Sequence, residues 1–317
     1  MRRAVVFDET GVRVVERAVP ALQLDEALIE LSVAGVCSTD LALTRGYMNF
    51  RGVLGHEFAG VVVQGPAEWV GQRVVGEINI ACGKCDLCLV GVPTQCRNRY
   101  TLGISGNYDG AFANVFKLAV RNLHRIPDNV SDIEAVFTEP LAAACQILQQ
   151  VHLRPTEPVY ILGVGRLGML CAQVIHQAGI PIIGIVRHDR QIELLEKWGI
   201  ESRRREDVPD AHAAIVVDCT GNAAGFAEAL TLVRPRGTIV LKSTYEGIPQ
   251  ANLSKLVVDE ITVVGSRCGP FDVALRLLAQ KRIDVLSMID GEYALSEAPA
   301  ALVRAAQGGV LKLLLRP

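Results

Sequence analysis

Residues 1 to about 135 carry short apolar runs that are separated by glycines and prolines. Such runs, with turn residues at their ends, are typical of β-strands. The five clearest runs lie at residues 4–7, 12–15, 27–31, 60–63 and 73–75. We therefore predict a β domain over residues 1–135, built as a partly open barrel.

Beyond about residue 133 the apolar residues recur three and four positions apart, which is the period of a buried helix face. These helical segments alternate with continuous apolar runs at residues 158–162, 182–186, 214–218, 238–241 and 261–264. The alternation predicts a doubly wound parallel sheet over residues 136–284, with strands buried on both faces. A last strand-like run at residues 311–315 is expected to return to the first domain, which residues 285–317 complete.

Composition narrows the possible partners. A chain of 317 residues favours two domains, and a hydrophobic share of 50% is enough to build a core in each. Lysine and arginine number 32 against 34 acidic residues, so neither nucleic acid nor an anionic membrane is expected as a partner. The first apolar run is too short for a signal peptide, and no run reaches the roughly 18 residues of a membrane span. We expect a cytoplasmic protein.

Four of the nine cysteines have the spacing C-x2-C-x2-C-x7-C, at Cys82, Cys85, Cys88 and Cys96. Four thiolates can close a tetrahedral shell around zinc and leave no position for a substrate. A loop of this composition cannot bury a core of its own, so we predict a structural zinc that holds its shape. An iron–sulfur cluster and an accidental group of thiols are the alternatives.

A second set of potential zinc ligands surrounds the stretch VLGHEFAG at residues 53–60. His56 and Glu57 are adjacent there, Cys37 lies upstream and Glu139 lies far downstream. A thiolate, an imidazole and a carboxylate are ligand types that zinc takes, and a catalytic zinc keeps one position open. Which of the two glutamates completes the shell stays open at this point.

Thr39 and Asp40 follow Cys37 closely. A ligating histidine needs a partner that orients its ring, and Asp40 is our candidate for His56. The Thr39 hydroxyl could accept and pass on the proton of a reacting alcohol. The alternative for both residues is a structural role, in a turn or at a helix N-cap.

The sequence Gly163-Val-Gly165-Arg166-Leu167-Gly168 matches the pattern G-x-G-x-x-G. It follows a predicted strand and opens a predicted helix, which is the context of a dinucleotide-binding turn. The glycines let the backbone approach a pyrophosphate at the helix N-terminus. A glycine-rich turn without a ligand is the alternative.

The end of the second strand distinguishes the two nicotinamide cofactors, because an acidic residue there holds the ribose 2′-hydroxyl and an arginine accommodates a 2′-phosphate. The chain has Arg187-His188-Asp189-Arg190 at this point. Arg187 is the first residue beyond the apolar run, whereas Asp189 is placed to cap the next helix. We therefore predict NADP rather than NAD. In the alternative, Arg187 and Arg190 are solvated and Asp189 reaches the ribose.

Further cofactor contacts are expected where later strands of the sheet end. The residues at these places are Cys219, Thr220, Lys242, Ser243 and Thr244. The cysteines outside the two metal sets are expected to be buried, unreactive thiols. They are Cys145, Cys171, Cys219 and Cys268.

Together these motifs resemble the zinc-dependent medium-chain dehydrogenase/reductase family, which includes alcohol, sorbitol and threonine dehydrogenases. The resemblance covers nearly the whole chain, with the Cys-x-Thr-Asp, Gly-His-Glu, four-cysteine and glycine motifs in the expected order. It implies a GroES-like β-barrel catalytic domain followed by a Rossmann domain. It also implies a catalytic zinc held by Cys37 and His56, with Glu57 as a ligand or near neighbour. Glu139 matches a glutamate of sorbitol-dehydrogenase-like members, which favours the polyol and sugar branch.

The resemblance implies a zinc-dependent oxidoreductase, a dimer or tetramer, that moves a hydride between NAD(P) and an alcohol or polyol, or the matching ketone or aldehyde. Zinc would polarise the substrate oxygen and Thr39 would relay the proton. Ala42 stands where some alcohol dehydrogenases carry a relay histidine, so the relay beyond Thr39 must differ. The rivals are a zinc-free quinone or enoyl reductase and a non-catalytic NADP-binding, redox-sensing protein that retains the zinc sites. A zinc-ribbon nucleic-acid module would need a basic stripe that the sequence lacks.

Overall fold

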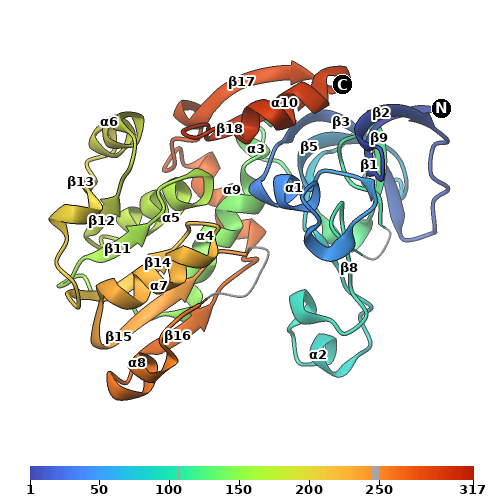
Figure 1. The fold of residues 1–317 in the computed structure, drawn as a ribbon. Helices are drawn as coiled ribbons and strands as arrows, with labels where there is room; N and C mark the ends of the chain where they lie inside the picture. The colour runs from blue at the N-terminus through green and yellow to red at the C-terminus, as the bar shows by residue number, and fades with distance from the viewer. Residues whose placement is uncertain (106–107, 245–249) are drawn as a thin grey trace. The chain divides into compact units, whose positions relative to one another are not determined.

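The computed structural model describes residues 1–105, 108–244 and 250–317. The chain divides into two units (Figure 1). The first comprises Met1–Glu139, Ala274–Lys281 and Met288–Pro317, and the second comprises Pro140–Val273 and Arg282–Ser287. The sequence placed the first boundary after residue 135, and the observed division places it after Glu139. Within the described ranges, no helix is both long and apolar enough to cross a membrane.

The first unit is mainly β-structure. Its largest sheet has the strand order β10-β6-β5-β3-β18-β17, and β9 also pairs with β3. The strands are β3 (Glu26–Gly35), β5 (Glu57–Gln64), β6 (Arg73–Gly76), β9 (Val115–Ala119), β10 (Leu123–Arg125), β17 (Ile289–Ala294) and β18 (Lys312–Arg316). Smaller sheets join β1 (Arg2–Asp8) to β2 (Gly11–Arg17) and β4 (Gly52–Val53), and β7 (Asn79–Ile80) to β8 (Tyr100–Thr101). Helices α1 (Ser38–Leu43), α2 (Asp86–Leu89), α3 (Asp132–Ala135) and α10 (Ala298–Ala305) belong to this unit.

Strand β3 is the centre of the largest sheet. It has β5 along one edge, and β9 and β18 share the other edge, so almost every residue of β3 is buried. Burial on both sides explains its nearly continuous apolar sequence. Leu314 and Leu315 of β18 pair with the last two residues of β3 in antiparallel register. The end of the chain therefore lies in the first unit.

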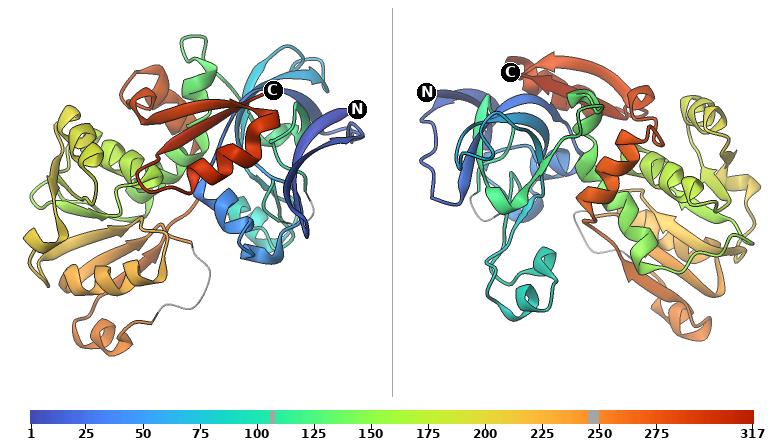
Figure 2. Two further views of the ribbon diagram at one scale, coloured as in Figure 1. Left: turned by 45° about the horizontal axis from the view of Figure 1, so that its top comes forward. Right: turned by 180° about the vertical axis from the view of Figure 1, so that it is seen from behind.

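The second unit is built around a parallel sheet with the strand order β13-β12-β11-β14-β15-β16. The strands are β11 (Val159–Leu162), β12 (Ile182–Ile185), β13 (Glu201–Arg203), β14 (Ala213–Asp218), β15 (Val233–Leu241) and β16 (Thr262–Gly265). The order reverses between β11 and β14, as in doubly wound dinucleotide-binding domains. Helices lie against both faces of the sheet (Figure 2). They are α4 (Thr138–Gln150), α5 (Arg166–Gln177), α6 (Asp189–Lys197), α7 (Ala223–Leu232) and α8 (Leu253–Val258). Helix α9 (Phe271–Ala279) is divided between the two units, with Ala274 and the residues after it in the first.

Four central strands of this sheet end in line. Leu162 of β11 pairs with Ile185 of β12 and with Asp218 of β14, and Asp218 pairs with Leu241 of β15. The residues that follow these strands therefore lie together at the carboxyl ends of the strands, which is the edge of the sheet where ligands bind. The glycine turn, the segment after β12 and the segments after β14 and β15 all start at this edge.

Some elements differ from the sequence pattern for local reasons. Helices α1 and α8 have six residues each, too few to show a helical period. The pattern also misses β17, whose sequence IDGEYA is half polar because the strand lies at the edge of its sheet. Helix α4 begins at Thr138, before Pro140. Pro140 lies in the first turn of α4, where a missing backbone N–H removes no helical hydrogen bond.

The pairing of β18 with β3 predicts that stability depends on the apolar side chains of β18. Leu314 is fully buried, and Leu314→Ala should lower the free energy of unfolding by about 2–5 kcal/mol through lost burial and a cavity. Val303→Ala, at an exposed site on α10, should change it by less than about 0.5 kcal/mol. Urea denaturation at equal metal content measures both variants. Equal stabilities would contradict this packing.

Candidate metal and dinucleotide sites

Three potential metal ligands lie together in the first unit. Cys37, His56 and Glu57 each offer one ligand atom, and these atoms all lie within 4.8 Å of one another. His56 and Glu57 are buried, and Cys37 is half-buried. Cys37 is the N-cap of α1, and Glu57 is the first residue of β5. A thiolate, an imidazole and a carboxylate at this spacing form a donor set that zinc accepts.

The pairing of β3 with β5 brings these ligands together. Gly35, the last residue of β3, pairs with Glu57, so Cys37 and His56 both lie just beyond the same end of the strand pair. A Cβ atom at Gly35 would lie 2.5 Å from Oε2 of Glu57. The absent side chain of Gly35 therefore gives the Glu57 carboxylate its place against β3.

Asp40 contacts two of these three residues, Cys37 and His56. Its carboxylate is completely buried, and its Oδ2 accepts the N–H of Cys37 at 2.9 Å. Its Oδ1 accepts the N–H of Gly55 at 3.2 Å and lies 3.3 Å from Nδ1 of His56, at an angle outside that of a hydrogen bond. Asp40 thus faces His56 and also completes the capping box of α1. This orientation leaves Nε2 of His56 for a metal ion.

The charges around His56 favour a cation. Burial lowers the pKa of His56, but the charges of Asp40 and Cys37 outweigh burial and raise it well above its ordinary value. The same negative groups would stabilise a bound metal ion. Oγ1 of Thr39 lies 3.8 Å from Sγ of Cys37, so the Thr39 hydroxyl lies beside the group.

Glu57 is held by a buried lysine. Nζ of Lys312, the first residue of β18, lies 2.5 Å from Oε2 of Glu57, and the two side chains are 2% and 1% exposed. The ammonium also lies 5.2 Å from the centroid of the Phe137 ring. Oε1 of Glu57 is buried and has no hydrogen-bond partner. A buried oxygen in this state is costly, and a metal ion would satisfy it.

Glu139 lies outside the three-residue group. It is half-buried in the first turn of α4. The carboxylate of the group comes instead from Glu57, which follows His56 directly and is fixed by Lys312. A contribution of Glu139 to the same ion stays a prediction.

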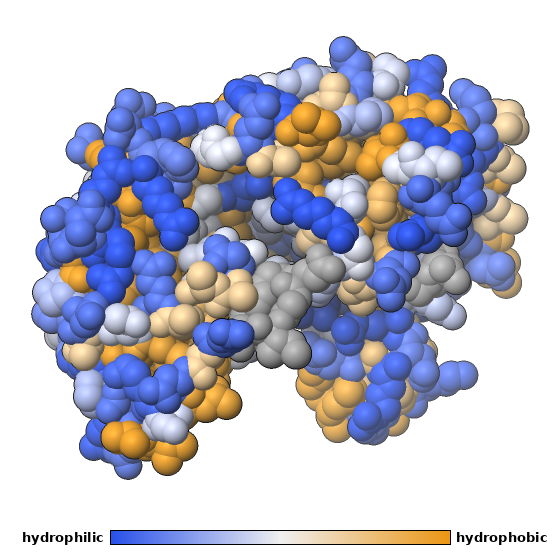
Figure 3. All heavy atoms as spheres, in the orientation of Figure 1, coloured by the Kyte–Doolittle hydropathy of each residue, from blue (hydrophilic) through white to orange (hydrophobic). Residues whose placement is uncertain are grey.

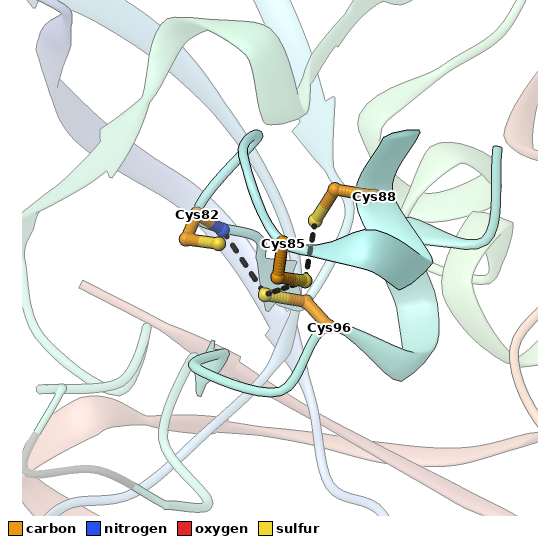
Figure 4. A group of neighbouring side chains, drawn as sticks. All are labelled: Cys82, Cys85, Cys88 and Cys96. Atoms are coloured by element: carbon orange, nitrogen blue, oxygen red, sulfur yellow. Dashed lines mark hydrogen bonds between the residues drawn. The ribbon is translucent and has the colours of Figure 1, made fainter. Parts of the chain in front are cut away.

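The four cysteines form a second group, whose ligand atoms also lie within 4.8 Å of one another (Figure 4). Sγ of Cys85 lies 3.5 Å from Sγ of Cys88 and 3.8 Å from Sγ of Cys96. The N–H groups of Cys82 and Asn98 donate to Sγ of Cys96 at 3.2 and 3.4 Å. The pairing of β7 with β8 closes the base of this loop.

Backbone donors favour thiolates in this loop. The N–H groups of Lys84 and Cys85 lower the pKa of Cys82 to about 6. Burial and the neighbouring sulfurs raise the pKa of Cys88 to about 12. A metal ion would reverse the second effect, because its charge stabilises every coordinated thiolate.

The glycine turn has the close contacts and the open side that a dinucleotide needs. Gly163 has a φ of 86°, and a Cβ atom there would lie 2.7 Å from Cα of Thr220. A Cβ atom on Gly168 would lie 2.3 Å from the carbonyl oxygen of Gly163. Gly165, the N-cap of α5, differs, because a Cβ atom there would meet nothing within 4 Å. A pyrophosphate can therefore approach the backbone at Gly165.

The segments after β14 and β15 are joined through Asp218, which is buried. Its Oδ1 accepts the N–H and the hydroxyl of Thr220 at 2.9 and 2.8 Å and the hydroxyl of Ser243 at 3.1 Å. Oγ of Ser243 also accepts the N–H of Gly221 at 2.9 Å. Thr220 and Ser243 thus shape the edge of the sheet beside the glycine turn, where Cys219 is half-buried.

Lys242 is buried and bound to three groups of its own unit, and its expected contact with the cofactor stays a prediction. Its ammonium donates to the carbonyl oxygens of Ala143 and Arg267 at 2.5 and 3.1 Å and to the hydroxyl of Ser266 at 3.1 Å. An ammonium has three donors, and these three acceptors all lie inside the second unit. Its ammonium therefore binds groups in the interior of the unit. Thr244, two residues further on, is exposed.

The segment after β12 carries exposed positive charge. The side chain of Arg187 is 70% exposed, and its guanidinium lies 3.7 Å from the carboxylate of Glu228. His188 is the N-cap of α6. The carboxylate of Asp189 is paired with Arg204 at 2.7 Å. Asp189 is itself 85% exposed, so the two residues differ in their ion pairs: Arg187 lies 3.7 Å from its partner carboxylate, whereas Asp189 is held at 2.7 Å.

Arg166 and Leu167 form the first turn of α5, and Arg190 donates to the carbonyl oxygen of Ser287 at 3.5 Å. Gln191, which the sequence does not single out, joins these segments. Its Oε1 accepts the N–H of Arg187 at 2.7 Å, and its Nε2 donates to the carbonyl oxygen in the glycine turn, that of Val164, at 2.7 Å.

No sequence signal marks Gln191, which is an ordinary polar residue of a helix. The sequence does carry a signal at Lys312 and at Asp218. Each places a charge at a buried position of an apolar run, and such charges are rarely buried without a partner.

Two family models match the chain. The model of the alcohol dehydrogenase GroES-like domain matches residues 23–128, which include both groups of potential metal ligands. The model of the zinc-binding dehydrogenase matches residues 167–280, from within the glycine turn to the end of α9.

Named proteins resemble the chain over nearly its full length. A sorbitol dehydrogenase of Halalkalibacterium halodurans is 28% identical, over 95% of this chain and 94% of its own. A D-arabitol-phosphate dehydrogenase of Enterococcus avium is also 28% identical, over 95% of this chain and 92% of its own. The structure of a candidate zinc-binding dehydrogenase of Sinorhizobium meliloti 1021, bound to NADP, has a TM-score of 0.90 and 27% identity and covers 100% of this chain and 99% of that chain.

Loss of Lys312 should leave Glu57 charged and buried without its partner. We expect Lys312→Met to lower the free energy of unfolding by about 3–5 kcal/mol. The double variant Glu57→Gln/Lys312→Met should be less destabilised than Lys312→Met, because it buries no unpaired charge. Arg316→Met, at an exposed site on the same strand, is the control. Chemical denaturation of the metal-free proteins compares all three; equal losses in the single and double variants would contradict the ion-pair account.

Proposed function

The chain belongs to the zinc-dependent medium-chain dehydrogenase/reductase family, and we propose that it transfers a hydride between NAD(P) and a polyol or sugar alcohol, or the matching ketone or aldehyde. The observation that carries this proposal is the Cys37–His56–Glu57 group in a chain that also has an open glycine turn. The named relatives are dehydrogenases of sorbitol and D-arabitol phosphate, which supports a polyhydroxylated substrate. We assign the metal chemistry to the first unit, a GroES-like domain, and cofactor binding to the second, a Rossmann domain.

Cys37, His56 and Glu57 would hold the catalytic zinc. When bound, zinc supplies a Lewis acid that polarises the substrate oxygen. Nδ1 of His56 faces the carboxylate of Asp40, so Nε2 is the ring nitrogen that would coordinate the metal. Lys312 binds Oε2 of Glu57, so this carboxylate would offer the metal only Oε1. With three protein ligands, one position stays open for the substrate.

Thr39 would hold the proton that leaves the substrate hydroxyl. A hydroxyl accepts and donates at the same oxygen, and Oγ1 of Thr39 lies beside Cys37. NAD(P) supplies the hydride chemistry. Ala42, on the same short helix, has no group that could continue a proton relay.

The four-cysteine loop would hold a second zinc with a structural role. Four thiolates complete a tetrahedral shell, so no position remains for a substrate. The N–H donors that point at Cys96, and the lowered pKa of Cys82, support a thiolate site.

We propose that NADP is preferred to NAD. Arg187 is exposed directly after β12, where a 2′-phosphate would be bound. Asp189 is engaged by Arg204, which supports its exclusion as a ligand of the ribose hydroxyl. The similar structure from Sinorhizobium meliloti has NADP bound.

An apolar surface supports assembly into a homodimer or tetramer. Leu253, Val257 and Val258 of α8 are 64%, 79% and 79% exposed, and apolar side chains gather over this helix in Figure 3. Such a patch marks an interaction surface. It lies next in sequence to β16, the last strand of the parallel sheet. A cytoplasmic location stays a prediction.

Removal of Cys37 should remove the catalytic zinc. We expect Cys37→Ala to bind about one zinc fewer per chain and to lose turnover of polyols by at least about 100-fold. Cys82→Ser should also lose about one zinc, but with a lower unfolding temperature, because its ion holds a loop. Elemental analysis and assays with NADP and NAD measure these effects.

Cys268→Ala, outside both groups, is the control and should keep both ions. Full activity of Cys37→Ala would overturn the catalytic assignment. Cofactor binding without turnover of any alcohol in the unaltered protein would favour a non-catalytic sensor, whereas the relatives' names favour the enzyme.

Arg187 should carry the preference between the cofactors. Arg187→Ala is expected to lower kcat/KM for NADP by about 10- to 100-fold, the value of a charge-assisted hydrogen bond, with little change for NAD. Arg234 lies at the start of β15, at the opposite end of the strands, so Arg234→Ala should change kcat/KM for neither cofactor. If Asp189→Ala lowered kcat/KM for NAD by more than Arg187→Ala lowered kcat/KM for NADP, Asp189 would be the residue that decides between the cofactors.

A further inference from the structure

Two cysteines that neither metal group uses lie beside the glycine turn. Cys171 is on α5 and is completely buried, and Cys219 directly follows β14 and is half-buried. Their Sγ atoms lie 3.9 Å apart, and Cys219 donates to Cys171. The expectation that Cys219 and Cys268 are buried is wrong, because both are half-buried, whereas Cys145 and Cys171 are buried as expected. Of the two half-buried thiols, Cys219 has a second thiol in reach.

The surroundings favour a thiolate on Cys171. The hydrogen bond from Cys219 lowers the pKa of Cys171, and the charge of Lys242 acts in the same direction, against burial. The same hydrogen bond raises the pKa of Cys219, so the pair shares its proton unequally. Cys145 is different, because burial raises its pKa to about 12. Of these thiols, Cys171 is the one prepared to act as a nucleophile.

Cys219 is part of the packing that shapes the glycine turn. A Cβ atom on Gly168 would lie 3.5 Å from Cβ of Cys219, and one on Gly163 would lie 2.9 Å from the carbonyl carbon of Cys219. A disulfide requires the sulfurs to approach to about 2.05 Å, well below the present separation. The 3.5 Å distance at Gly168 is an ordinary contact, but at Gly163 even a methyl group would be too close to the backbone of Cys219. A shift of the Cys219 backbone on disulfide formation would therefore be passed directly to Gly163 and the turn.

We propose that Cys171 and Cys219 form a reversible disulfide in the presence of a peroxide, and that this bond weakens dinucleotide binding. The second half of this inference rests on the proposed function, which places the pyrophosphate at the glycine turn. The disulfide would make the enzyme sensitive to oxidants at its cofactor site. A bound dinucleotide, in turn, would cover the edge from which Cys219 is reached and slow the oxidation.

The chemistry balances with one hydrogen peroxide. Cys219, the thiol that solvent reaches, passes its proton to Cys171 through their hydrogen bond, and its sulfur attacks one peroxide oxygen. The O–O bond breaks, the hydroxide that leaves takes the proton back from Cys171 to become water, and a sulfenic acid remains on Cys219. The thiolate of Cys171 then attacks this sulfur, the S–S bond forms, and hydroxide leaves and takes up a proton to become water. Two thiols are oxidised, one peroxide is reduced, and two waters form. A dithiol reductant reverses the reaction.

The test uses the full-length, zinc-loaded protein treated with hydrogen peroxide. Peptide mapping by mass spectrometry should find the peptides of Cys171 and Cys219 joined, with the loss of two hydrogens, and dithiothreitol should separate them. NADP titration should show binding weakened by about tenfold or more after oxidation, because strained disulfides store energy of this size. Prior saturation with NADP should slow the cross-link.

Cys171→Ser should keep NADP binding and become insensitive to peroxide, and Cys171→Ala serves if the serine variant does not fold. Cys268→Ser, another half-buried cysteine of the same unit, should remain as sensitive as the unaltered protein. A map without the 171–219 cross-link, or with Cys145 joined in its place, overturns the proposal. A cross-link that leaves NADP binding unchanged overturns the claim that the disulfide weakens dinucleotide binding. If the reduced protein binds no dinucleotide, the proposed function and this claim both fail, but the peptide map still tests the disulfide itself.

Discussion

The pairing of three strands at Gly35 is the constraint on which the group of potential metal ligands depends. Gly35 of β3 pairs with Glu57 of β5 on one side and with Leu314 of β18 on the other. The pairing with β5 places Cys37 beside His56, and the pairing with β18 brings Lys312 from near the end of the chain to Glu57. A side chain at Gly35 would occupy the place of the Glu57 carboxylate. The site is thus a consequence of sheet pairing as much as of its ligands.

In the second unit the corresponding constraint is the common end of four parallel strands. Asp218 and Gln191 use this edge to join loops that are far apart in sequence, through hydroxyl and backbone groups. Hydrogen bonds hold these loops at the carboxyl ends of the strands, and Cys219, which directly follows Asp218, donates to Cys171 there. Cofactor binding and thiol chemistry would therefore act on one set of contacts.

The sequence predicts the fold and the ligand types well, because both are local patterns. Apolar runs that alternate with helical periods are sufficient for the parallel sheet, and the spacing of the four cysteines is sufficient for their group. The position of the Glu57 carboxylate is not a local property, since it depends on Lys312, which β18 brings from near the end of the chain. The direction of the Lys242 side chain and the distance between Cys171 and Cys219 also depend on packing between elements, which no spacing reveals.

Diffraction at the zinc absorption edge, from crystals of the zinc-loaded protein, tests the central claim most directly. The account predicts an anomalous peak about 2.3 Å from Sγ of Cys37 and about 2.0–2.1 Å from a ring nitrogen of His56. The peak expected at the four-cysteine loop serves as the internal control for zinc loading. A strong peak at that loop, with none between Cys37 and His56, would contradict the claim that these residues hold a reactive metal ion.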